Sequence, residues 1–234
     1  MKKILILGAS SDIGVELTKH YINRNYQVIA HCNKNDKNLK KLSKKNLKIF
    51  KFDLKNISSF EKNVDKNKIF NNIDILISLT GYLKLRTMKN VKAKDFTDHF
   101  NANYLSNFII TKKITNFMKK NNWGRIVYAS SIGTKFGGSN NSFVYSLSKF
   151  MNEFFPKPLK NLTKNNILIN TLQIGLTDTK LNRIDKNKNM KKRIDLIPLK
   201  RMAEIKEVVN YIVFLASKDN SLISNQVINI SGGE

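Results

Sequence analysis

Short apolar, β-branched runs recur along the chain, separated by longer stretches with the 3.6-residue spacing of amphipathic helices. These helical stretches include Ile13–Arg24, Phe96–Lys120 and Glu204–Ala216. We expect strands at the apolar runs, namely Lys3–Leu7, Tyr26–His31, Leu47–Phe52, Ile73–Leu79, Arg125–Ser130, Ile167–Gln173 and Gln226–Ile230. Strands that alternate with helices predict an α/β fold: a single Rossmann-like domain with a doubly wound, seven-stranded parallel sheet and helices on both faces.

The pattern is continuous enough to place residues 1–234 in one dinucleotide-binding and catalytic domain, a size that a single α/β domain reaches. In such sheets, ligands bind at the carboxyl ends of the strands, near the point where the strand order switches. The lysine-rich stretch Thr177–Lys200 interrupts the alternation and predicts a substrate lid over that edge.

The apolar runs also bear on location. None is long enough for a membrane-spanning helix, so we expect no membrane partner. Met1-Lys2-Lys3 resembles the start of a signal peptide, but the apolar run from Ile4 to Leu7 is too short and enters a glycine turn, which favours a cytoplasmic protein. The single cysteine, Cys32, excludes a disulfide framework, and no residue cluster predicts a metal site.

The formal net charge of +25 raises a nucleic-acid hypothesis. The excess consists mainly of lysine, with 36 lysines and 6 arginines, whereas bidentate and stacking contacts to bases favour arginine. We therefore attribute most of the charge to a lysine-rich composition of solvated helix faces and expect no nucleic-acid partner.

The first strand runs into a glycine turn that opens the first helix, which is the setting of a dinucleotide-phosphate loop. Gly8 permits the tight turn, and Gly14 lets the helix pack close to the strand. The backbone N–H groups at the helix N-terminus would then face a pyrophosphate. The expected cofactor-binding residues of this loop are Gly8, Ser10, Ser11, Asp12, Ile13 and Gly14. Since a carboxylate repels phosphate, we expect Asp12 to cap the helix with its side chain turned away.

The end of the second strand bears on the choice between NADP and NAD. An NAD-binding fold places a carboxylate on the ribose 2′-hydroxyl about 20 residues after the loop. This chain has Asn33 and Lys34 there, and Lys34 could pair with a 2′-phosphate. NADP(H) is therefore favoured over NAD(H), although the nearby Asp36 keeps NAD(H) open.

A phenol and an ammonium lie four residues apart at Tyr145 and Lys149, on one helix face. A nearby cation stabilises a phenolate, which makes a tyrosine competent in proton transfer near neutral pH. In a lysine-rich chain with seven tyrosines, about one Tyr–Lys pair at this spacing is expected by chance. The pair is therefore informative only together with other candidate residues. Ser131 follows the strand Arg125–Ser130, and Asn103 lies in the long preceding helix.

With these residues in place, the whole chain from Lys3 to Gly233 resembles the short-chain dehydrogenase/reductase family, most closely its 3-oxoacyl-acyl-carrier-protein reductases. The glycine loop matches at Gly8 and Gly14, with Asp12 in place of the middle glycine. Further matches are Asn103-Tyr104-Leu105-Ser106-Asn107-Phe108, Gly175-Leu176-Thr177-Asp178-Thr179 and Asn225-Gln226-Val227-Ile228-Asn229-Ile230-Ser231-Gly232-Gly233. The spacing to Gly124 fits Asn103 better than Asn101 as the family asparagine.

The resemblance implies residue roles. Tyr145 would exchange a proton with the substrate oxygen, Lys149 would lower the pKa of Tyr145 and hold the nicotinamide ribose, and Ser131 would bond the substrate oxygen. Asn103 would hold a helix kink and a water that relays protons. Besides the glycine loop, Tyr145 and Lys149, the implied cofactor contacts are Asn33, Lys34, Asp53, Leu54, Gly81, Thr177 and Thr179.

The sequence departs from the family at several places. Ser78-Leu79-Thr80-Gly81 replaces the usual Asn-Asn-Ala-Gly, and Ile174 replaces the proline before Gly175. Pro156 and Pro158 fall in the helix that begins near Tyr145, which the family uses to dimerise. Because proline breaks a helix, we expect a shortened or bent helix and an altered interface between subunits.

These observations favour an NAD(P)-dependent oxidoreductase that reduces a ketone to a secondary alcohol, acting as a homodimer or homotetramer. A 3-oxoacyl group on an acidic carrier protein and a keto-sugar fit equally well. A basic rim could steer an acidic carrier, and its members are Lys188, Lys191, Lys192 and Arg193. The alternative is a non-catalytic Rossmann protein that binds nucleotide or polyanions. The scattered His20, His31 and His99 are expected to be structural or exposed.

Overall fold

The computed structural model describes residues 1–42, 44–185 and 189–234, and within these ranges the chain forms one seven-stranded sheet in which every pairing is parallel. The strand order is β3-β2-β1-β4-β5-β6-β7. The strands are β1 Lys3–Leu7, β2 Gln27–Cys32, β3 Leu47–Lys51, β4 Ile75–Ser78, β5 Gly124–Ser131, β6 Ile167–Ile174 and β7 Val227–Ile230. The doubly wound parallel sheet predicted from the sequence is confirmed, with strand ends shifted by at most two residues.

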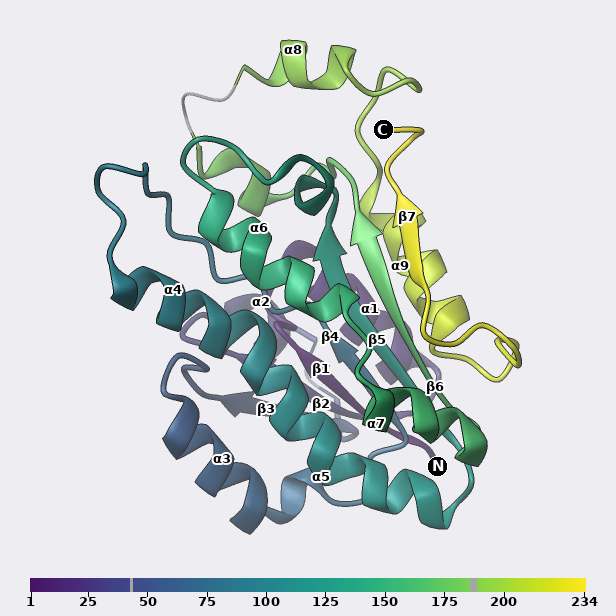
Figure 1. Cartoon of the computed structure of the whole chain (residues 1–234). Coiled ribbons are helices and arrows are strands. Elements are labelled where there is room, and N and C mark those ends of the chain that lie inside the picture. Colours follow the sequence, from purple (N-terminus) through teal and green to yellow (C-terminus); the bar gives the residue numbers. More distant parts are fainter. Residues whose placement is uncertain (43, 186–188) are drawn as a thin grey trace.

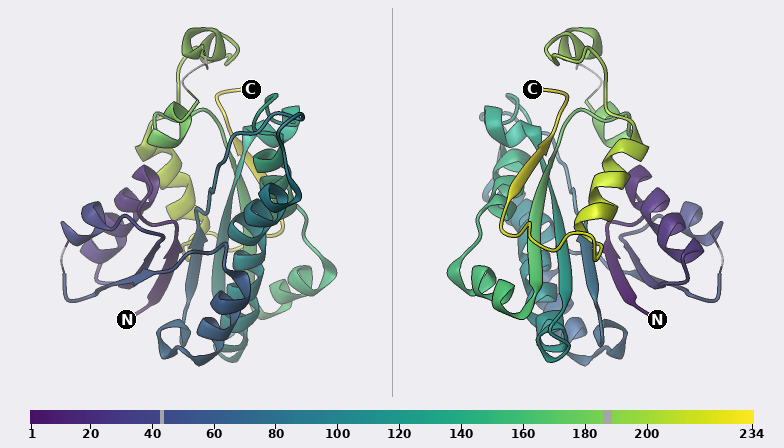
Figure 2. Two further views of the ribbon diagram at one scale, coloured as in Figure 1. Left: turned by 90° about the vertical axis from the view of Figure 1, so that its left-hand side faces the viewer. Right: turned by 90° about the vertical axis from the view of Figure 1, so that its right-hand side faces the viewer.

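Helices cover both faces of this sheet (Figure 1, Figure 2). The described α-helices are α1 Asp12–Asn23, α2 Lys37–Lys40, α3 Ile57–Lys66, α4 Ala93–Phe100, α5 Ser106–Lys120, α6 Phe143–Phe150, α7 Lys157–Lys160, α8 Met190–Asp195 and α9 Ile205–Leu215. Helices α1 and α9 pack side by side on one face, while α3, α4, α5 and α6 lie on the other.

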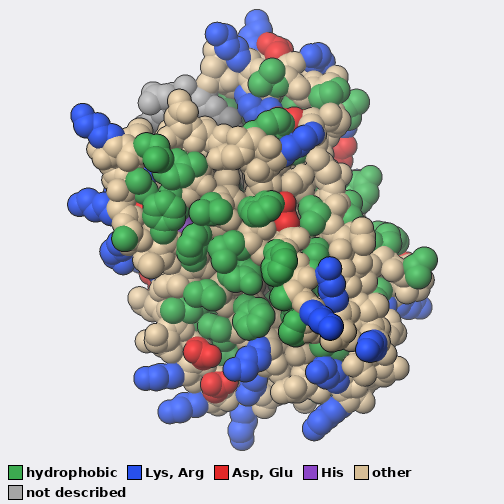
Figure 3. All heavy atoms as spheres, in the orientation of Figure 1, with side chains coloured by type: hydrophobic (Ala, Val, Ile, Leu, Met, Phe, Trp, Pro, Cys, Tyr) green, Lys and Arg blue, Asp and Glu red, His purple; other side chains and the backbone are tan. Residues whose placement is uncertain are grey.

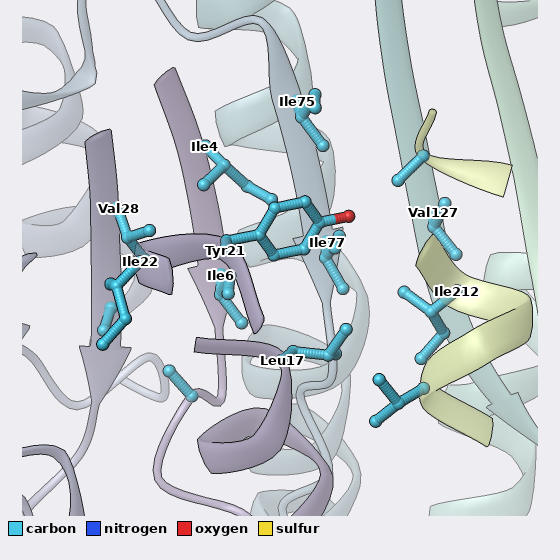
Figure 4. Packing of buried hydrophobic residues seen from close by; sticks show 14 of the residues in the cluster. Ile4, Ile6, Leu17, Tyr21, Ile22, Val28, Ile75, Ile77, Val127 and Ile212 are labelled. Carbon is cyan, nitrogen blue, oxygen red and sulfur yellow. The ribbon is translucent and has the colours of Figure 1, made fainter. Parts of the chain in front are cut away.

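The two faces are built by the two-residue alternation of each strand. Ile4 and Ile6 point into the core cluster on the side of α1 and α9 (Figure 4), whereas Leu5 and Leu7 point into the cluster on the side of α3 and α5. All four side chains are fully buried. The continuous apolar run of β1 therefore reflects a strand covered on both faces, as expected for a parallel sheet.

The strand order switches at β1, because the chain leaves it first toward β2 and later returns on its other side with β4. The carboxyl ends of these neighbouring strands diverge into connections on opposite faces, which opens a crevice at that edge. The described parts of the segment 177–200, residues 177–185 and 189–200, rise above the same edge (Figure 1), and the second of them carries α8.

The helix that begins near Tyr145 is short, as the prolines predict. Helix α6 ends at Phe150, a single 3₁₀ turn follows at Met151–Glu153, and Pro156 stands at the N-cap of the separate helix α7. The proline ring fixes its own φ and has no N–H to donate, so it begins a new helix instead of continuing the old one.

Candidate active site

A cleft of about 1220 Å³ lies at the carboxyl ends of the central strands. Most residues proposed from the sequence line it: Gly8, Ser10, Ser11, Asp12, Ile13, Asn33, Asp53, Leu54, Gly81, Ser131, Tyr145, Lys149, Thr177 and Thr179. Gly14, Lys34 and Asn103 are not among its lining residues. Segments from seven different parts of the chain thus converge on one hollow.

The glycine loop has the tight geometry that the sequence predicts. Gly8 has a φ of +72°, and a Cβ there would lie 2.8 Å from the carbonyl oxygen of Leu79. A Cβ at Gly14 would lie 2.7 Å from the backbone of Ala9, so this glycine serves the packing of helix on strand and not the cleft. Both positions exclude a side chain, which lets the backbone N–H groups at the start of α1 approach a phosphate ligand closely.

The expectation for Asp12 is wrong in one respect. Ser11, and not Asp12, is the N-cap of α1: its Oγ accepts a hydrogen bond of 3.1 Å from Gly14 N. The Asp12 carboxylate instead accepts a hydrogen bond of 2.8 Å from Lys180 N and lies 3.4 Å from Lys180 Nζ. Asp12 therefore ties the glycine loop to the segment 177–200, a contact between residues too distant in sequence for local patterns to reveal.

His31 is a residue of the loop that sequence reasoning did not place there. Its Nδ1 accepts a hydrogen bond of 3.2 Å from Gly8 N, and its Nε2 lies 3.0 Å from the carbonyl oxygen of Phe52. Burial lowers the pKa of His31 to about 4, so the imidazole is neutral at physiological pH. Neutral His31 can accept from Gly8 at Nδ1 and donate to Phe52 at Nε2, which joins the ends of three strands.

The end of β2 is arranged differently from the expectation for Lys34. Asn33 lines the cleft, whereas Lys34 is exposed outside its lining. Asp36 is buried and its carboxylate pairs with Lys51 at 2.7 Å and with Lys40 at 3.3 Å, so its charge is satisfied away from the cleft. Of these three residues, Asn33 is the one that lines the cleft.

The catalytic candidates meet at the end of β5. Ser131 is its last residue, and α6 brings Tyr145 and Lys149 to the same cleft. A Cβ built at Gly81 would lie 3.8 Å from the hydroxyl oxygen of Tyr145, so Gly81 lies beside that hydroxyl. Lys149 Nζ donates a hydrogen bond of 2.6 Å to the carbonyl oxygen of Thr80. The departure from the family at Ser78–Gly81 therefore still supplies a backbone partner for the ammonium.

Proton affinities in this cluster differ from the sequence expectation. Burial raises the pKa of Tyr145 to about 12, and Lys149 does not offset that rise. Burial also lowers the pKa of Lys149 to about 7, against the opposing effect of Glu153. The predicted lowering of the Tyr145 pKa by Lys149 is absent from the chain as described, because desolvation by burial is the one resolved influence on the phenol.

Asn103 lies at a break in the predicted long helix. The segment Asn101–Leu105 is π-helical, between α4 and α5, which is the kink that the resemblance implied. Asn103 is fully buried: its Oδ1 accepts from Tyr82 N at 2.7 Å, and its Nδ2 donates to Tyr82 O at 3.0 Å and to Ser148 Oγ at 2.9 Å. Asn101 instead donates to Lys55 O. The geometry thus favours Asn103 over Asn101 as the family asparagine. Asn103 lies behind the residues that line the cleft.

The comparisons agree with this site. A family profile described as short chain dehydrogenase matches residues 2–190. The chain belongs to the short-chain dehydrogenase family. Family membership makes it an oxidoreductase with a nicotinamide cofactor, and the glycine loop, Tyr145 and Lys149 all lie within the matched residues.

Among curated relatives of this dehydrogenase are two proteins named 3-oxoacyl-[acyl-carrier-protein] reductase FabG. The protein of Buchnera aphidicola subsp. Baizongia pistaciae is 30% identical, with 99% of this chain and 97% of the relative covered. The protein of Buchnera aphidicola subsp. Schizaphis graminum is 31% identical, with 99% and 96% covered. A solved structure of a 3-oxoacyl (acyl-carrier-protein) reductase from Agrobacterium tumefaciens C58 with NADP bound has a TM-score of 0.86, 20% identity and 100% and 94% coverage, which supports the dehydrogenase fold.

Two kinds of feature are absent from the described ranges of this dehydrogenase, a membrane-spanning helix and a metal-binding cluster. In residues 1–42, 44–185 and 189–234, no helix has the length and apolar character needed to cross a bilayer. The same ranges hold no group of three or more His, Cys, Asp or Glu side chains placed to bind a metal ion. Of the predicted basic rim, Lys188 lies outside the described residues, and Arg193 forms an ion pair with Glu234.

Proposed function

We propose that this dehydrogenase reduces a ketone to a secondary alcohol with NADP(H), and that Tyr145 is the proton donor. The observation that carries the proposal is the convergence of Ser131, Tyr145 and Lys149 on one cleft that also contains the glycine loop. A dinucleotide fits these residues: Gly8 leaves no side chain over the loop, and α1 presents its N-terminus to the cleft.

In this proposal, each side chain has a separate task. Ser131 Oγ donates a hydrogen bond to the substrate carbonyl oxygen, and Tyr145 transfers its phenolic proton to that oxygen. The ammonium of Lys149 stabilises the phenolate that remains, while its bond to Thr80 O leaves two N–H groups for ribose hydroxyls. The bound nicotinamide supplies the hydride to the carbonyl carbon.

The substrate class follows from the cleft walls and their rim. Apolar side chains of Phe136, Leu181 and Leu196 line the cleft, and Lys192 lines it from α8. These residues favour an acyl chain with an acidic carrier, as in the 3-oxoacyl thioesters named for the relatives. A keto-sugar is the second candidate, favoured by the hydroxyl and amide groups of Ser139, Asn141 and Ser142 in the same cleft.

The deciding experiment follows the loss of reduced nicotinamide absorbance with NADPH or NADH and a ketone panel. The panel holds a 3-oxoacyl thioester on carrier protein, the same acyl group on a short thiol, and a keto-sugar. We expect NADPH-dependent turnover that falls by about 10²–10⁴-fold in Tyr145→Phe. The matched control is Tyr211→Phe, which removes a half-exposed hydroxyl on α9. Cofactor binding without turnover of any ketone would instead support the non-catalytic alternative.

We also propose that the protein is a cytoplasmic homodimer or homotetramer. Hydrophobic side chains gather over α4, α5 and α6 (Figure 3), including the exposed Leu105, Phe108, Leu147, Phe150 and Phe154. Such a patch favours burial against a second copy. The break before Pro156 places Phe154 beyond the end of α6, so we expect its contribution to the interface to depend on this break. Light scattering of Phe150→Ser against wild type tests this, with a loss of the oligomer as the expected result.

A further inference from the structure

Glu153 lies directly behind the catalytic candidates. It follows Lys149 by four residues, as Lys149 follows Tyr145, and the turn Met151–Glu153 continues the direction of α6. Tyr145 and Lys149 line the cleft, but Glu153 does not. Glu153 is therefore a partly buried carboxylate that the mechanism above leaves without a task.

The carboxylate is the centre of a polar network between β5 and β6. Its Oε1 accepts hydrogen bonds from Ser130 Oγ at 2.5 Å, Thr134 Oγ1 at 2.8 Å and Gln173 Nε2 at 3.2 Å. Asn229 Nδ2 in turn donates to Gln173 Oε1 at 3.3 Å. Donors from three elements thus bind one carboxylate, and β7 is linked to it through Gln173; a partly buried carboxylate would be costly without such donors.

Two of these donors stand on either side of Ser131. Ser130 precedes it on β5, and Thr134 lies in the 3₁₀ turn Ile132–Phe136 that follows it. Because Glu153 binds both, it joins the strand end that carries Ser131 to the helical segment that carries Tyr145 and Lys149. The relative placement of the Ser131 and Tyr145 hydroxyls decides whether both can reach the same substrate carbonyl oxygen.

We propose that Glu153 is a positioning residue of this site: it holds Ser131 in register with Tyr145 and keeps Lys149 in its charged form. This inference rests on the proposed function. The expected effect of the Glu153 carboxylate on the Lys149 ammonium follows from general electrostatics, since a buried ammonium is stabilised by an opposite charge and destabilised by desolvation.

The surroundings of Lys149 leave Glu153 as its electrostatic partner. Lys149 is 2% exposed, and burial lowers its pKa to about 7 while Glu153 raises it. The elements packed on α6 carry other titratable or charged side chains, namely Lys94, Asp95, Asp98, His99, Tyr104, Arg125, Tyr128 and Lys135. Asp95 and Asp98 are paired with Lys84 and Lys94. Among described residues, Glu153 is the one charge with a resolved effect on Lys149.

The test separates charge from hydrogen bonding. Glu153→Gln keeps a carbonyl oxygen for the serine and threonine hydroxyls but removes the charge. Glu61→Gln, on the exposed side of α3, is the matched control. Titration of Lys149 followed by NMR of ¹³Cε-labelled lysine should give a midpoint about one pH unit lower in Glu153→Gln than in wild type or Glu61→Gln. The variant Lys149→Arg lacks the labelled Lys149 side chain, so the NMR signal missing from its spectrum belongs to Lys149.

A second measurement connects the charge to turnover. In the reductive direction, the high-pH limb of kcat/KM should move down with the Lys149 midpoint in Glu153→Gln, and Glu153→Asp should restore it. An unmoved Lys149 midpoint in Glu153→Gln that retains the wild-type fold overturns the inference. If the midpoint moves as expected but wild type turns over no ketone, the proposed function fails while the link from Glu153 to Lys149 stands.

Discussion

The Asp12 carboxylate accepts a 2.8 Å hydrogen bond from the backbone N–H of Lys180, 168 residues further along the chain. Lys180 begins the 3₁₀ turn Lys180–Arg183, and its Nζ lies 3.4 Å from the second carboxylate oxygen. One side chain of the glycine loop thus holds the base of the segment 177–200. The loop position that is a glycine in the related family motif is Asp12 here, and its side chain holds the segment to the loop.

Removing this tether should release the segment locally. In Asp12→Gly, the Lys180 amide loses its acceptor, and we expect its hydrogen exchange to become roughly tenfold faster, since a charge-assisted hydrogen bond contributes about 1.5–3 kcal/mol. Asp12→Asn keeps an oxygen acceptor and loses only an exposed ion pair, so its exchange should change by less than about threefold. Mass spectrometry of peptides covering 177–185 measures both. Equal exchange in Asp12→Gly and wild type would show that the contact does not order the segment.

The buried imidazole of His31 should make the protein sensitive to acid. Its folded pKa of about 4 lies below the ordinary histidine value of 6.5, so the unfolded chain binds the proton more readily between these values. Stability should therefore fall as pH drops from 6.5 to 4, by about 3 kcal/mol from this group. Urea unfolding from pH 7 to 4 measures the effect.

The variant His31→Gln cannot titrate in this range. Its stability deficit relative to wild type should shrink as the pH falls through the window. His20→Gln, which removes a partly exposed imidazole on α1, is the comparison: burial also lowers the pKa of His20, so its deficit should shrink in the same direction but by less than that of His31→Gln. A deficit of His31→Gln that is constant with pH would contradict the neutral, buried state of His31.

Asn103 should matter for stability as well as for turnover. In Asn103→Leu, the N–H and C=O of Tyr82 and the hydroxyl of Ser148 lose a partner that is itself fully buried, and we expect the free energy of unfolding to fall by about 3 kcal/mol. Asn101→Leu removes one partly buried bond to Lys55 O and should cost about 1 kcal/mol. Thermal unfolding compares the pair. Similar losses in both variants would remove the special role of Asn103 at the π-helical turn.

Cofactor choice should depend on Asn33 and not on Lys34. A carboxylate in Asn33→Asp would repel a 2′-phosphate and could accept from a 2′-hydroxyl, so the NADPH to NADH ratio of kcat/KM should fall by about 100-fold. Lys34→Ala should change this ratio by less than about twofold, because Lys34 is exposed outside the cleft. Steady-state rates with both cofactors decide. A collapse of NADPH use in Lys34→Ala would restore the role that the sequence gave to that lysine.

The prolines illustrate how far local rules reach. Pro156 predicts the end of a helix from its own chemistry, and α6 ends before it with α7 beginning after it. In the same way, Gly8 predicts a positive φ and Gly14 a close helix–strand contact, both of which are present. Each rule depends only on the residue and its immediate neighbours.

The pKa values of the site residues could not be predicted from the sequence. The pair Tyr145 and Lys149 could be found from its spacing, but their pKa values depend on burial by β5, the 3₁₀ turn after it and the loop at Thr80. Desolvation is a property of the whole packed surroundings, so the spacing alone gave the wrong direction for Tyr145. No sequence motif marks Glu153, because the three side chains that donate hydrogen bonds to its carboxylate come from separate parts of the chain.

The sequence by itself determined the parallel sheet, the glycine loop and the resemblance to the family, and it named Ser131, Tyr145 and Lys149 as catalytic candidates, because strand alternation, turn chemistry and helical spacing are encoded within a few residues. Only the tertiary structure decided that Asp12 binds Lys180, that His31 joins Gly8 to Phe52, and that Glu153 stands behind Lys149. The physical reason is that hydrogen bonds and desolvation act through space, between residues that only the finished fold brings together.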